Sequence, residues 1–408
     1  MKKHIDRAII RLVIATGISS VVTQLLTIRE VLAQFQGNEI VIALVLFNWL
    51  CLGGLGTLLA RVITRRPWKA TIIKLGWLSL VLCGLSALQL PAIRELRNLI
   101  FISGSSVGFY PTWLFSFLSI APYCLLLGFL LPFSLFVIRA GISDYPGTRI
   151  YIIDNIGDIS GGALFSFVLV YLVTPLQAIF LANLPLLAAV YLLFPVLRRH
   201  RPAVVQAMVL VFVVLAAGIF WEKASLAPAA GKLAYYRETR YGRIAVHRDG
   251  EQFTLFEDGM PVFSSQNLSL AEETVHYPLS QLDRIEHVLL ISAQGGIMAE
   301  LQKYQLKSID YVELDPEVTA VQLQFGMIKP ISGLNVIHQD GRAYLAQTDK
   351  SYDAIIVNLP EPGTFQMNRF YTDRFFKLAQ KRLSSKGVLG FSMQGFDNYL
   401  AEPQRQKL

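Results

Sequence analysis

The sequence predicts a two-part fold, in which a membrane domain of about seven helices precedes an α/β domain with a parallel, doubly wound sheet. Between Ala8 and Trp221 the chain contains repeated apolar runs of about 20 residues, the length that spans a bilayer. No run after Trp221 approaches this length. Between residues 287 and 362, four short apolar runs alternate with more polar stretches, a pattern typical of parallel strands joined by helices.

Seven spans are predicted in the first half of the chain: residues 8–28, 39–60, 70–90, 112–138, 151–173, 175–197 and 203–221. The first follows the basic segment MKKHIDR, but no small-residue cleavage site comes after it, so we interpret it as a retained helix. The fifth and sixth spans are joined only at residues 173–175 and form the weakest pair. Residues 91–111 are too short and polar to span, and we expect them to lie in the membrane interface.

The loop charges predict the orientation of these spans. Residues 1–222 carry 17 Lys and Arg against 8 Asp and Glu, whereas residues 223–408 carry 20 against 21. Lys and Arg accumulate on the cytoplasmic side. With the N-terminus in the cytoplasm, 14 of the basic residues fall inside and 3, namely Arg29, Arg94 and Arg97, fall outside. We therefore expect an integral protein of a bacterial inner membrane with the lipid bilayer as a partner. Seven spans place the C-terminal domain on the outer, periplasmic face, and one miscounted span would invert it.

Several polar residues fall at membrane depth. Asp154, Asn155 and Asp158 lie in the segment YIIDNIGDISGG, and Glu30 ends the first apolar run. Charges inside a bilayer are costly and face the bundle interior or water, so one interpretation is a path for protons, ions or small cations. The other is close helix packing, because small residues let helices approach each other. The small residues of this segment are Gly157, Gly161 and Gly162.

The second half begins with residues 222–236, interpreted as a linker of small residues. Alternating segments at 243–247, 253–256 and 260–263, separated by Asp-Gly turns, predict a small antiparallel β meander. A helix is expected over 269–282, with Asn267 or Ser269 near its cap. The predicted divisions are thus a helical domain (1–222), a linker with the meander (223–285) and a Rossmann-like domain (286–408).

The four strands expected in the parallel sheet are 288–291, 309–312, 334–337 and 354–357. Such sheets bind ligands at the carboxyl ends of their strands. The residues at those ends are Gly295, Gly296, Glu313, Asp340 and Asn358.

Other kinds of site find no support in the sequence. The three cysteines, Cys51, Cys83 and Cys124, fall in apolar spans and form no disulfide or metal pattern. His276 and His287 are isolated and are expected to be structural, so no metal site is predicted. The basic excess belongs to the loops between spans rather than to a soluble face, and we therefore expect no nucleic-acid partner.

A series of segments in the second half matches a known family. In order they are YRETRYGRIAV, LFEDGMPVFS, HVLLI, YVELDPEV, QDGRAYL, YDAIIVNLPEP, FYTDRFF and GVLGFSMQ. Over about residues 235–395 this order resembles the spermidine synthase, or polyamine aminopropyltransferase, family. The first half is similar to the multi-span region of membrane-fused spermidine-synthase-like proteins. The resemblance implies a sheet of the spermidine synthase and S-adenosylmethionine-methyltransferase type.

Family members transfer the aminopropyl group of decarboxylated S-adenosylmethionine to a diamine. The resemblance implies that Glu313 holds the ribose hydroxyls and that Asp340, before Gly341, contacts the adenine amino group. It also places Gly295 and Gly296 in the loop that approaches the cofactor. If binding is retained, we expect decarboxylated S-adenosylmethionine or a related nucleoside. The alternative roles are a solvated strand end for Glu313 and a helix cap for Asp340.

Other positions depart from the family pattern. The family's catalytic Asp corresponds to Asn358, and an amide cannot accept the amine proton as a base. Glu361 matches the second acidic position of the same motif and is the alternative carboxylate for this role. Gly295 stands where the family has the Asp that meets the aminopropyl amine. The remaining departures are Ser292, Ala293 and Gln294 for glycines, Leu270 and Ala271 for Tyr and His before Glu272, and Gly242 for Gln.

Beyond the strand expected at 387–393 the family continues with a helix and two antiparallel strands, so this domain is expected to be short at its C-terminal end. An open sheet edge needs a cover, which predicts a protein partner or a second copy of the chain. Three functions stay open, and enzymatic activity is left undecided. They are a non-catalytic binding or assembly module of a membrane complex, a divergent active aminopropyltransferase, and a transporter or sensor of polyamines or small cations.

Overall fold

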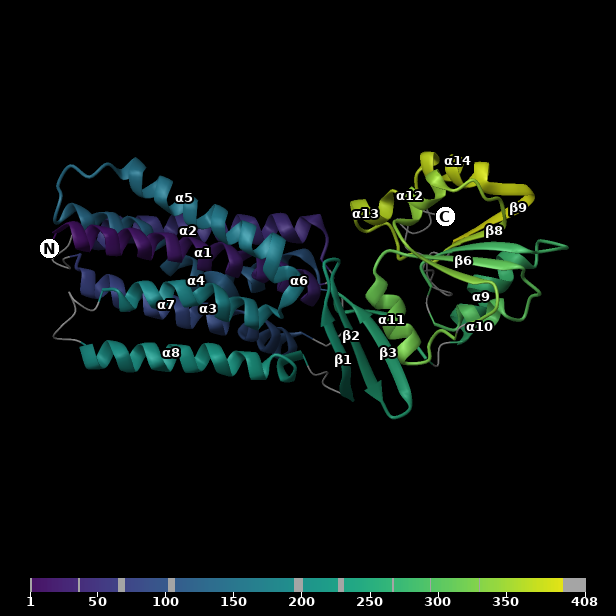
Figure 1. Cartoon of the computed structure of the whole chain (residues 1–408), viewed down its shortest axis with the longest axis horizontal. Coiled ribbons are helices and arrows are strands. Elements are labelled where there is room, and N and C mark those ends of the chain that lie inside the picture. The colour runs from purple at the N-terminus through teal and green to yellow at the C-terminus, as the bar shows by residue number, and fades with distance from the viewer. Residues whose placement is uncertain are drawn as a thin grey trace. The chain divides into compact units, whose positions relative to one another are not determined.

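The structure is a computed structural model that describes residues 2–35, 37–64, 70–101, 107–193, 201–226, 231–265, 268–293, 295–329 and 331–391. Its internal contacts divide the chain into two compact units (Figure 1). The first unit comprises Met1–Arg243 with Glu257–Met260, and the second comprises Ile244–Phe256 with Pro261–Leu408. Each unit has its own buried apolar core.

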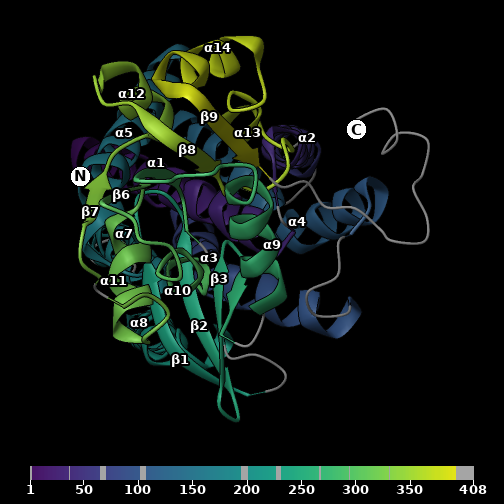
Figure 2. The same cartoon turned by 90° about the vertical axis from the view of Figure 1, so that its right-hand side faces the viewer.

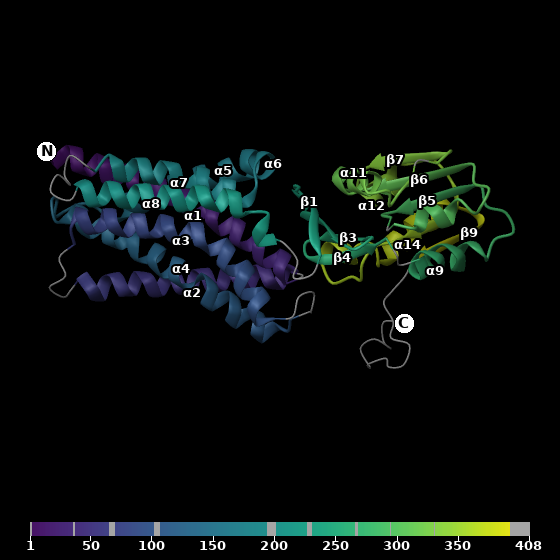
Figure 3. The same cartoon turned by 90° about the horizontal axis from the view of Figure 1, so that it is seen from below.

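The first unit is a bundle of helices that run alongside one another (Figures 1 and 3). Six described helices are long and apolar enough to cross a membrane, and the sixth predicted span is the shorter helix α7. The fifth span is one continuous helix in which a π-helical segment, η1, joins α5 to α6. The bounds are α1 Lys2–Gln34, α2 Glu39–Thr64, α3 Ile72–Ile100, α4 Phe109–Arg139, α5 Gly147–Leu164, η1 Phe165–Leu169, α6 Val170–Leu172, α7 Pro175–Tyr191 and α8 Arg201–Trp221.

Glycines allow the helices of the bundle to pack closely. A Cβ atom on Gly56 of α2 would collide with the carbonyl oxygen of Leu125 in α4. A Cβ atom on Gly128 of α4 would collide with the carbonyl oxygen of Gly53 in α2. Close backbone approach through small residues is the usual means of helix association in membranes.

Two predictions for this unit are wrong. Helix α3 continues to Ile100, so the third predicted span, 70–90, ends ten residues too early. The interfacial location expected for residues 91–111 stays a prediction. The helix can carry Arg94 here because two carboxylates neutralise its charge. The expected linker at 222–236 contains a short 3-10 helix, Ala224–Leu226, and most of strand β1, Lys232–Glu238.

The chain leaves the bundle at the end opposite its N-terminus. Glu222, just after α8, pairs with Arg94 near the end of α3 at 2.8 Å. Its other oxygen accepts a hydrogen bond of 2.7 Å from the backbone of Leu176, at the start of α7. The end of α8 therefore lies beside the end of α3 and the start of α7.

Strands β1 to β4 form a four-stranded sheet in chain order, as the predicted meander requires, with β1 as an additional strand. After β1 the strands are β2 Arg243–Asp249, β3 Gln252–Glu257 and β4 Met260–Ser264. Helix α9 spans Leu268–Leu279, close to the expected 269–282, and its proposed cap Asn267 lies outside the described residues.

The second unit contains the predicted parallel sheet, with the strand order β7-β6-β5-β8-β9. Strand β5 pairs with β6 on one side and with β8 on the other, and every described pairing of this sheet is parallel. The strands are β5 His287–Ile291, β6 Ser308–Glu313, β7 Leu334–His338, β8 Tyr352–Val357 and β9 Leu383–Phe391. The expected shortness of the C-terminal end concerns residues 392–408, which lie outside the described residues, and the partner expected at the sheet edge stays a prediction.

Alternate side chains of the central strand enter two separate cores, as the period of two in a strand requires. Helices lie on both faces of the sheet (Figure 2). Val288 and Leu290 pack with α9 and α10 (Ile297–Leu301) on one face. Leu289 and Ile291 pack on the other face with α12 (Gly341–Gln347) and α14 (Asp373–Arg382). Because helices cover both faces, ligand access is left to the carboxyl ends of the strands.

Candidate functional site

The strand order reverses its direction between β5 and β8. From β5 the chain goes outward through β6 to β7, and then returns to β8 on the other side. At this point the backbone N–H of Asn358 donates a hydrogen bond of 2.9 Å to the carbonyl oxygen of Ile291. Ligands of open α/β sheets bind beside such a switch point, outside the carboxyl ends of the strands. The loop after β5 and the residue after β8 therefore define the candidate site.

The loop after β5 is constrained on two sides. Ser292 has a positive φ of 59°, a conformation that favours glycine. Gly295 lies directly against the ring of Phe263, which leaves no room for a Cβ atom. Gly296 has φ +87°, and a Cβ atom added to it would lie 3.0 Å from the Cβ of Ala271. Gln294 lies outside the described residues. Of the described loop residues, Ser292 and Gly296 thus adopt a positive φ, and Phe263 packs against Gly295.

Glu313 ends β6 and is buried. One carboxylate oxygen accepts hydrogen bonds from the backbone N–H groups of Leu314 and Asp315, at 2.8 and 3.4 Å. The other accepts from the hydroxyls of Ser292 and Tyr311, at 3.0 and 3.3 Å. A carboxylate has about four acceptor positions, and four protein donors lie around this one. The single proton of the Tyr311 hydroxyl also faces Oε1 of Gln322, at 3.4 Å.

The pKa of Glu313 reflects this environment. Burial raises it above the ordinary value, and the hydrogen bonds from Ser292 and the backbone oppose that rise only in part. The Ser292 hydroxyl lies on the loop after β5, whereas the other donors belong to β6 or to the backbone that follows it. It is therefore the donor that a ligand hydroxyl could replace.

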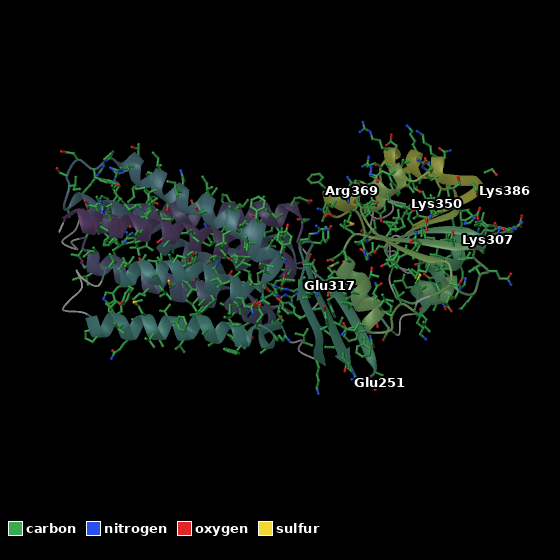
Figure 4. The ribbon with its side chains drawn as sticks, in the orientation of Figure 1. Glu251, Lys307, Glu317, Lys350, Arg369 and Lys386 are labelled. Atoms are coloured by element: carbon green, nitrogen blue, oxygen red, sulfur yellow. The ribbon has the colours of Figure 1, made fainter. Side chains whose placement is uncertain are left out.

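Asp340 acts as the N-cap of α12. Its Oδ1 accepts a hydrogen bond of 2.9 Å from the backbone N–H of Ala343, and its Oδ2 pairs with Arg369. Arg369, labelled in Figure 4, follows the short helix α13 (Phe365–Asn368). The next residue, Gly341, lies so close to Ile291 that a Cβ atom would be 2.6 Å from its side chain. The structure therefore places Asp340 in the capping role that the sequence left open beside adenine recognition.

Asn358 follows β8 and is 6% exposed. Its side-chain nitrogen, Nδ2, is buried and has no hydrogen-bond partner within the described residues. A buried donor without a partner costs about 1–3 kcal/mol, and in native proteins it calls for an explanation such as a ligand or water. Asn358 is therefore the residue of this site with a hydrogen bond to offer.

Glu361 lies three residues further along, in the turn that holds Tyr371. The hydroxyl of Tyr371 donates to the carbonyl oxygen of Pro360 at 3.2 Å. Burial, and in addition the charge of Glu361, raises the pKa of Tyr371. Of the departures noted in the sequence, Ala271 is buried in α9 against the glycine loop, whereas Gly242 lies in the first unit beside Asp258.

Asp154, Asn155 and Asp158 lie on α5, which packs against α1. A Cβ atom on Gly17 of α1 would be 2.9 Å from the carbonyl oxygen of Asp154 and from the backbone nitrogen of Asp158. On the opposite helix, a Cβ atom on Gly161 would be 2.7 Å from the carbonyl oxygen of Ile18. The three polar residues therefore adjoin a close helix contact, and a path for ions stays a prediction.

A buried ion cluster in the first unit was not predicted from the sequence. Glu30 of α1 pairs with Arg94 at 2.8 Å and with Arg243 at 2.7 Å. Arg94 also pairs with Glu222, while Arg243 pairs with Glu238 at 2.6 Å. Arg29 completes the cluster with a bond of 2.9 Å to Glu238. The cluster ties α1 and α3 to the end of α8 and to strand β1.

The electrostatics of this cluster favour ionised groups. Burial alone would raise the pKa of Glu238, but Arg243 and Arg29 outweigh it and lower this pKa below the ordinary value. Burial likewise would lower the pKa of Arg243, yet Glu238 and Glu30 raise it. The sequence signal was Glu30, an acid inside an apolar run, but its partners lie 64 and 213 residues away.

The described residues contain no group of three or more His, Cys, Asp or Glu side chains that could hold a metal ion. His276 bonds to Tyr304 and Glu300, both at 2.7 Å, and His287 bonds to Ser308 at 2.7 Å. Both histidines thus have structural partners.

Comparison with known proteins identifies the second unit. Residues 268–404 match the family model of the spermine/spermidine synthase domain. The C-terminal part of this chain is a spermine/spermidine synthase domain. The chain is 28% identical over 259 residues to the polyamine aminopropyltransferase of Oceanobacillus iheyensis, covering 59% of this chain and 51% of that protein. It is 26% identical over 260 residues to polyamine aminopropyltransferase 2 of Aquifex aeolicus, covering 60% and 52%.

The chain spans about half the length of these curated relatives. A shorter match, 32% identical over 183 residues, links it to the polyamine aminopropyltransferase of Prochlorococcus marinus subsp. pastoris, with 41% of this chain and 64% of that protein covered. Among solved structures, a spermidine synthase in complex with the transition-state analogue AdoDATO is 18% identical, with a TM-score of 0.36 over 40% of this chain and 59% of the other. The spermidine synthase domain of this chain is thus a distant relative of proteins named for aminopropyl transfer.

Proposed function

We propose that this protein is a membrane-anchored binding protein whose spermidine synthase domain holds a nucleoside ligand without transferring aminopropyl groups. The observation that carries the proposal is Asn358, a buried amide with an unpartnered Nδ2 at the switch point of the sheet. An amide there offers a hydrogen bond to a ligand but no base for a reaction.

Aminopropyl transfer needs such a base. The nitrogen lone pair of the acceptor amine attacks the carbon next to the sulfonium, the carbon–sulfur bond breaks, and the thioether leaves with the bonding electrons. The acceptor is an ammonium in water, so it must first lose a proton to a positioned group. Two carboxylates of this site are otherwise engaged, because Glu313 accepts hydrogen bonds from protein donors on both oxygens and Asp340 caps α12 beside Arg369. The third, Glu361, lies three residues beyond the position of the family's base.

Ligand binding asks less of the same residues. A ribose hydroxyl would take the place of the Ser292 hydroxyl on Glu313, and Nδ2 of Asn358 would donate to an acceptor atom of the ligand. The exchange of one hydroxyl for another keeps Glu313 satisfied. S-adenosylmethionine, its decarboxylated form and 5′-methylthioadenosine all carry this ribose, and they are the ligand class that we propose.

For the first unit we propose insertion into the cytoplasmic membrane with the N-terminus inside. The six long apolar helices support insertion, and the bias of Lys and Arg supports the orientation. Because the chain leaves the bundle at the end opposite its N-terminus, this orientation puts the synthase domain outside the cytoplasm.

The test is calorimetric titration of the full chain in detergent micelles with 5′-methylthioadenosine and decarboxylated S-adenosylmethionine. We expect binding that Ser292→Gly tightens about five-fold, since one competing hydrogen bond is removed. Glu313→Gln should weaken binding by about ten-fold or more, because a hydrogen bond to a charged group is lost. Glu317→Gln, the same substitution four residues away, is the matched control and should leave binding unchanged.

An aminopropyl transfer assay on the same samples separates this proposal from its alternative. No aminopropyl product is expected from the wild-type chain with putrescine or spermidine as acceptor. Product from the wild-type chain that Asn358→Leu abolishes would overturn the proposal in favour of an active transferase. Absence of binding by every nucleoside would overturn it in favour of a purely structural domain.

A further inference from the structure

A cleft of about 720 Å³ opens in the first unit, between the C-terminal ends of α2 and α4 and the N-terminal end of α5. Pockets that hold small molecules measure about 300–1,000 Å³, so its size suits a ligand. The residues that line it are Thr57, Leu58, Arg61, Thr64, Ala70, Leu131, Pro132, Leu135, Phe136, Ala140, Ile150 and Tyr151.

The described lining of the cleft is mostly apolar, and among these lining residues the charged side chain is Arg61. Leu135 and Phe136 form part of one wall, and the buried side chain of Ile150 lies at its base. The hydroxyl of Thr57 is engaged, since it donates to the carbonyl oxygen of Gly128 at 3.0 Å. Arg61 is exposed at the cleft, and within the described part of the chain nothing pairs with its guanidinium. A cation beside an apolar slot fits an amphiphile with a negative head and a hydrocarbon tail.

The surrounding charge has the same sign. This end of the bundle is where α1 and α3 begin and where α2 and α4 end. The cationic side chains described there, besides Arg61, are Arg7, Arg11, Lys74, Arg139 and Arg149, and the acidic ones are Asp6 and Asp144. Arg139 donates to the backbone of Tyr145 at 3.0 Å, and Arg149 lies 5.7 Å from the centre of the Tyr145 ring. Neither of these contacts neutralises its charge.

We infer that this cleft binds an anionic phospholipid, with the phosphate at Arg61 and one acyl chain along Leu135 and Phe136. Basic pockets between membrane helices on the cytoplasmic side bind anionic head groups. The charge bias puts this end of the bundle on that side. The inference rests on the membrane location proposed above, and goes beyond it by naming the lipid class and the contact that selects it.

The experiment uses the full chain in detergent and native mass spectrometry. Dioleoyl-phosphatidylglycerol or dioleoyl-phosphatidylcholine is added at the same molar ratio, so that the acyl chains are identical and only the head group differs. We expect phosphatidylglycerol to be retained about five-fold more than phosphatidylcholine, the contribution of about one surface cation. Arg61→Gln should remove this preference. Arg11→Gln, an exposed arginine at the same end but outside the cleft, should keep it.

A second variant tests the acyl-chain position. Leu135→Trp fills the cleft and should reduce retention of both lipids at least three-fold in a chain that still elutes as a single species. Equal retention of the two lipids by the wild type would overturn the inference. So would equal effects of Arg61→Gln and Arg11→Gln, and so would displacement of the lipid by glycerol 1-phosphate alone, which would indicate a free-phosphate site. Failure of the membrane location itself is distinguished by cell fractionation, where the chain would appear in the soluble fraction.

Discussion

The ion cluster of the helical unit and the strand ends of the synthase domain treat buried polar groups in opposite ways. In the cluster, Glu30 and Glu238 each meet two arginines, within 2.9 Å. At the strand ends, Asn358 keeps a buried nitrogen for which the described residues supply no partner. The free-energy cost of burying an unpaired charge is too large for a stable fold, whereas the cost of burying a neutral amide without a hydrogen bond is moderate. An amide can therefore stay unpartnered until a ligand binds. The comparison distinguishes groups that hold the fold from a group that is available for binding.

The largest effect is expected from breaking the cluster. Arg94→Gln leaves Glu30 and Glu222 without a shared cation, and removing one partner of a buried pair costs about 3–5 kcal/mol. We expect a lower free energy of unfolding, measured by thermal or denaturant unfolding of the full chain in detergent. Arg11→Gln, on an exposed face of α1, should change it by less than about 0.5 kcal/mol. Equal stability of the two variants would show that the cluster does not hold the bundle.

A smaller loss tests the packing beside the α5 carboxylates. A Cβ atom on Gly157 would collide with the carbonyl oxygen of Ile14, so Gly157→Ala should destabilise the bundle by about 1–3 kcal/mol. Gly84→Ala is the matched control, because nothing lies within 4 Å of its new carbon. Its stability should rise by up to about 1 kcal/mol, the difference in helix propensity. Unchanged stability of Gly157→Ala would show that α1 and α5 are not in close contact here, and would favour the ion path over close packing.

Asn358→Leu tests whether the buried side-chain nitrogen of Asn358 serves ligand binding rather than stability. The substitution removes a buried donor without a partner and keeps a similar shape, so the ligand-free domain should gain about 1 kcal/mol of stability. The same variant should lose nucleoside binding in the calorimetric titration. A loss of stability instead would mean that Nδ2 has a partner in the protein, and the binding role would fall.

The smallest expected effect is a difference in pH dependence between the two regions. Glu238 has a lowered pKa, because Arg243 and Arg29 outweigh burial, so its stabilisation is present above its ordinary value of 4.5 and is lost as the pH falls. Glu313 has a pKa raised by burial, so its contribution is fully present below 4.5 and declines as the pH rises through the folded-state value.

Hydrogen exchange of peptides covering 232–243 and 308–315 can follow the two regions separately, over a range that runs from well below pH 4.5, where Glu238 is protonated, up to neutral pH. Acidification should speed exchange in the first peptide relative to Glu238→Gln, and should slow it in the second relative to Glu313→Gln. The same direction in both peptides would contradict the opposite environments of the two carboxylates.

Much of the fold follows from local properties of the sequence. The strands β5, β6 and β8 each contain a short apolar run, because a strand covered on both faces needs apolar side chains throughout. The edge strand β7 is mostly exposed, and its shorter apolar run was still enough to predict it. Strand β1 was missed because its segment, KLAYYRE, mixes exposed and half-buried positions and lacks such a run. The predicted end of helix α3 came too early because a charged residue such as Arg94 is expected outside an apolar span. Its buried partners Glu30 and Glu222, which allow it inside the helix, are distant in the sequence.

What the sequence by itself determined is therefore the class of each half, the parallel sheet and the residues at the strand ends. Each depends on residue type and on spacing along the chain, whereas the departure at Asn358 follows from the resemblance to the family. Only the tertiary structure decided that Glu30 meets Arg243 across 213 residues, that Glu313 spends its acceptor positions on Ser292, Tyr311 and the backbone, and that Asp340 is a cap. These outcomes depend on which groups, distant in sequence, are buried together. Burial removes the hydrogen bonds of a polar group to water, so each such group is stabilised by a partner in the protein or by a bound ligand.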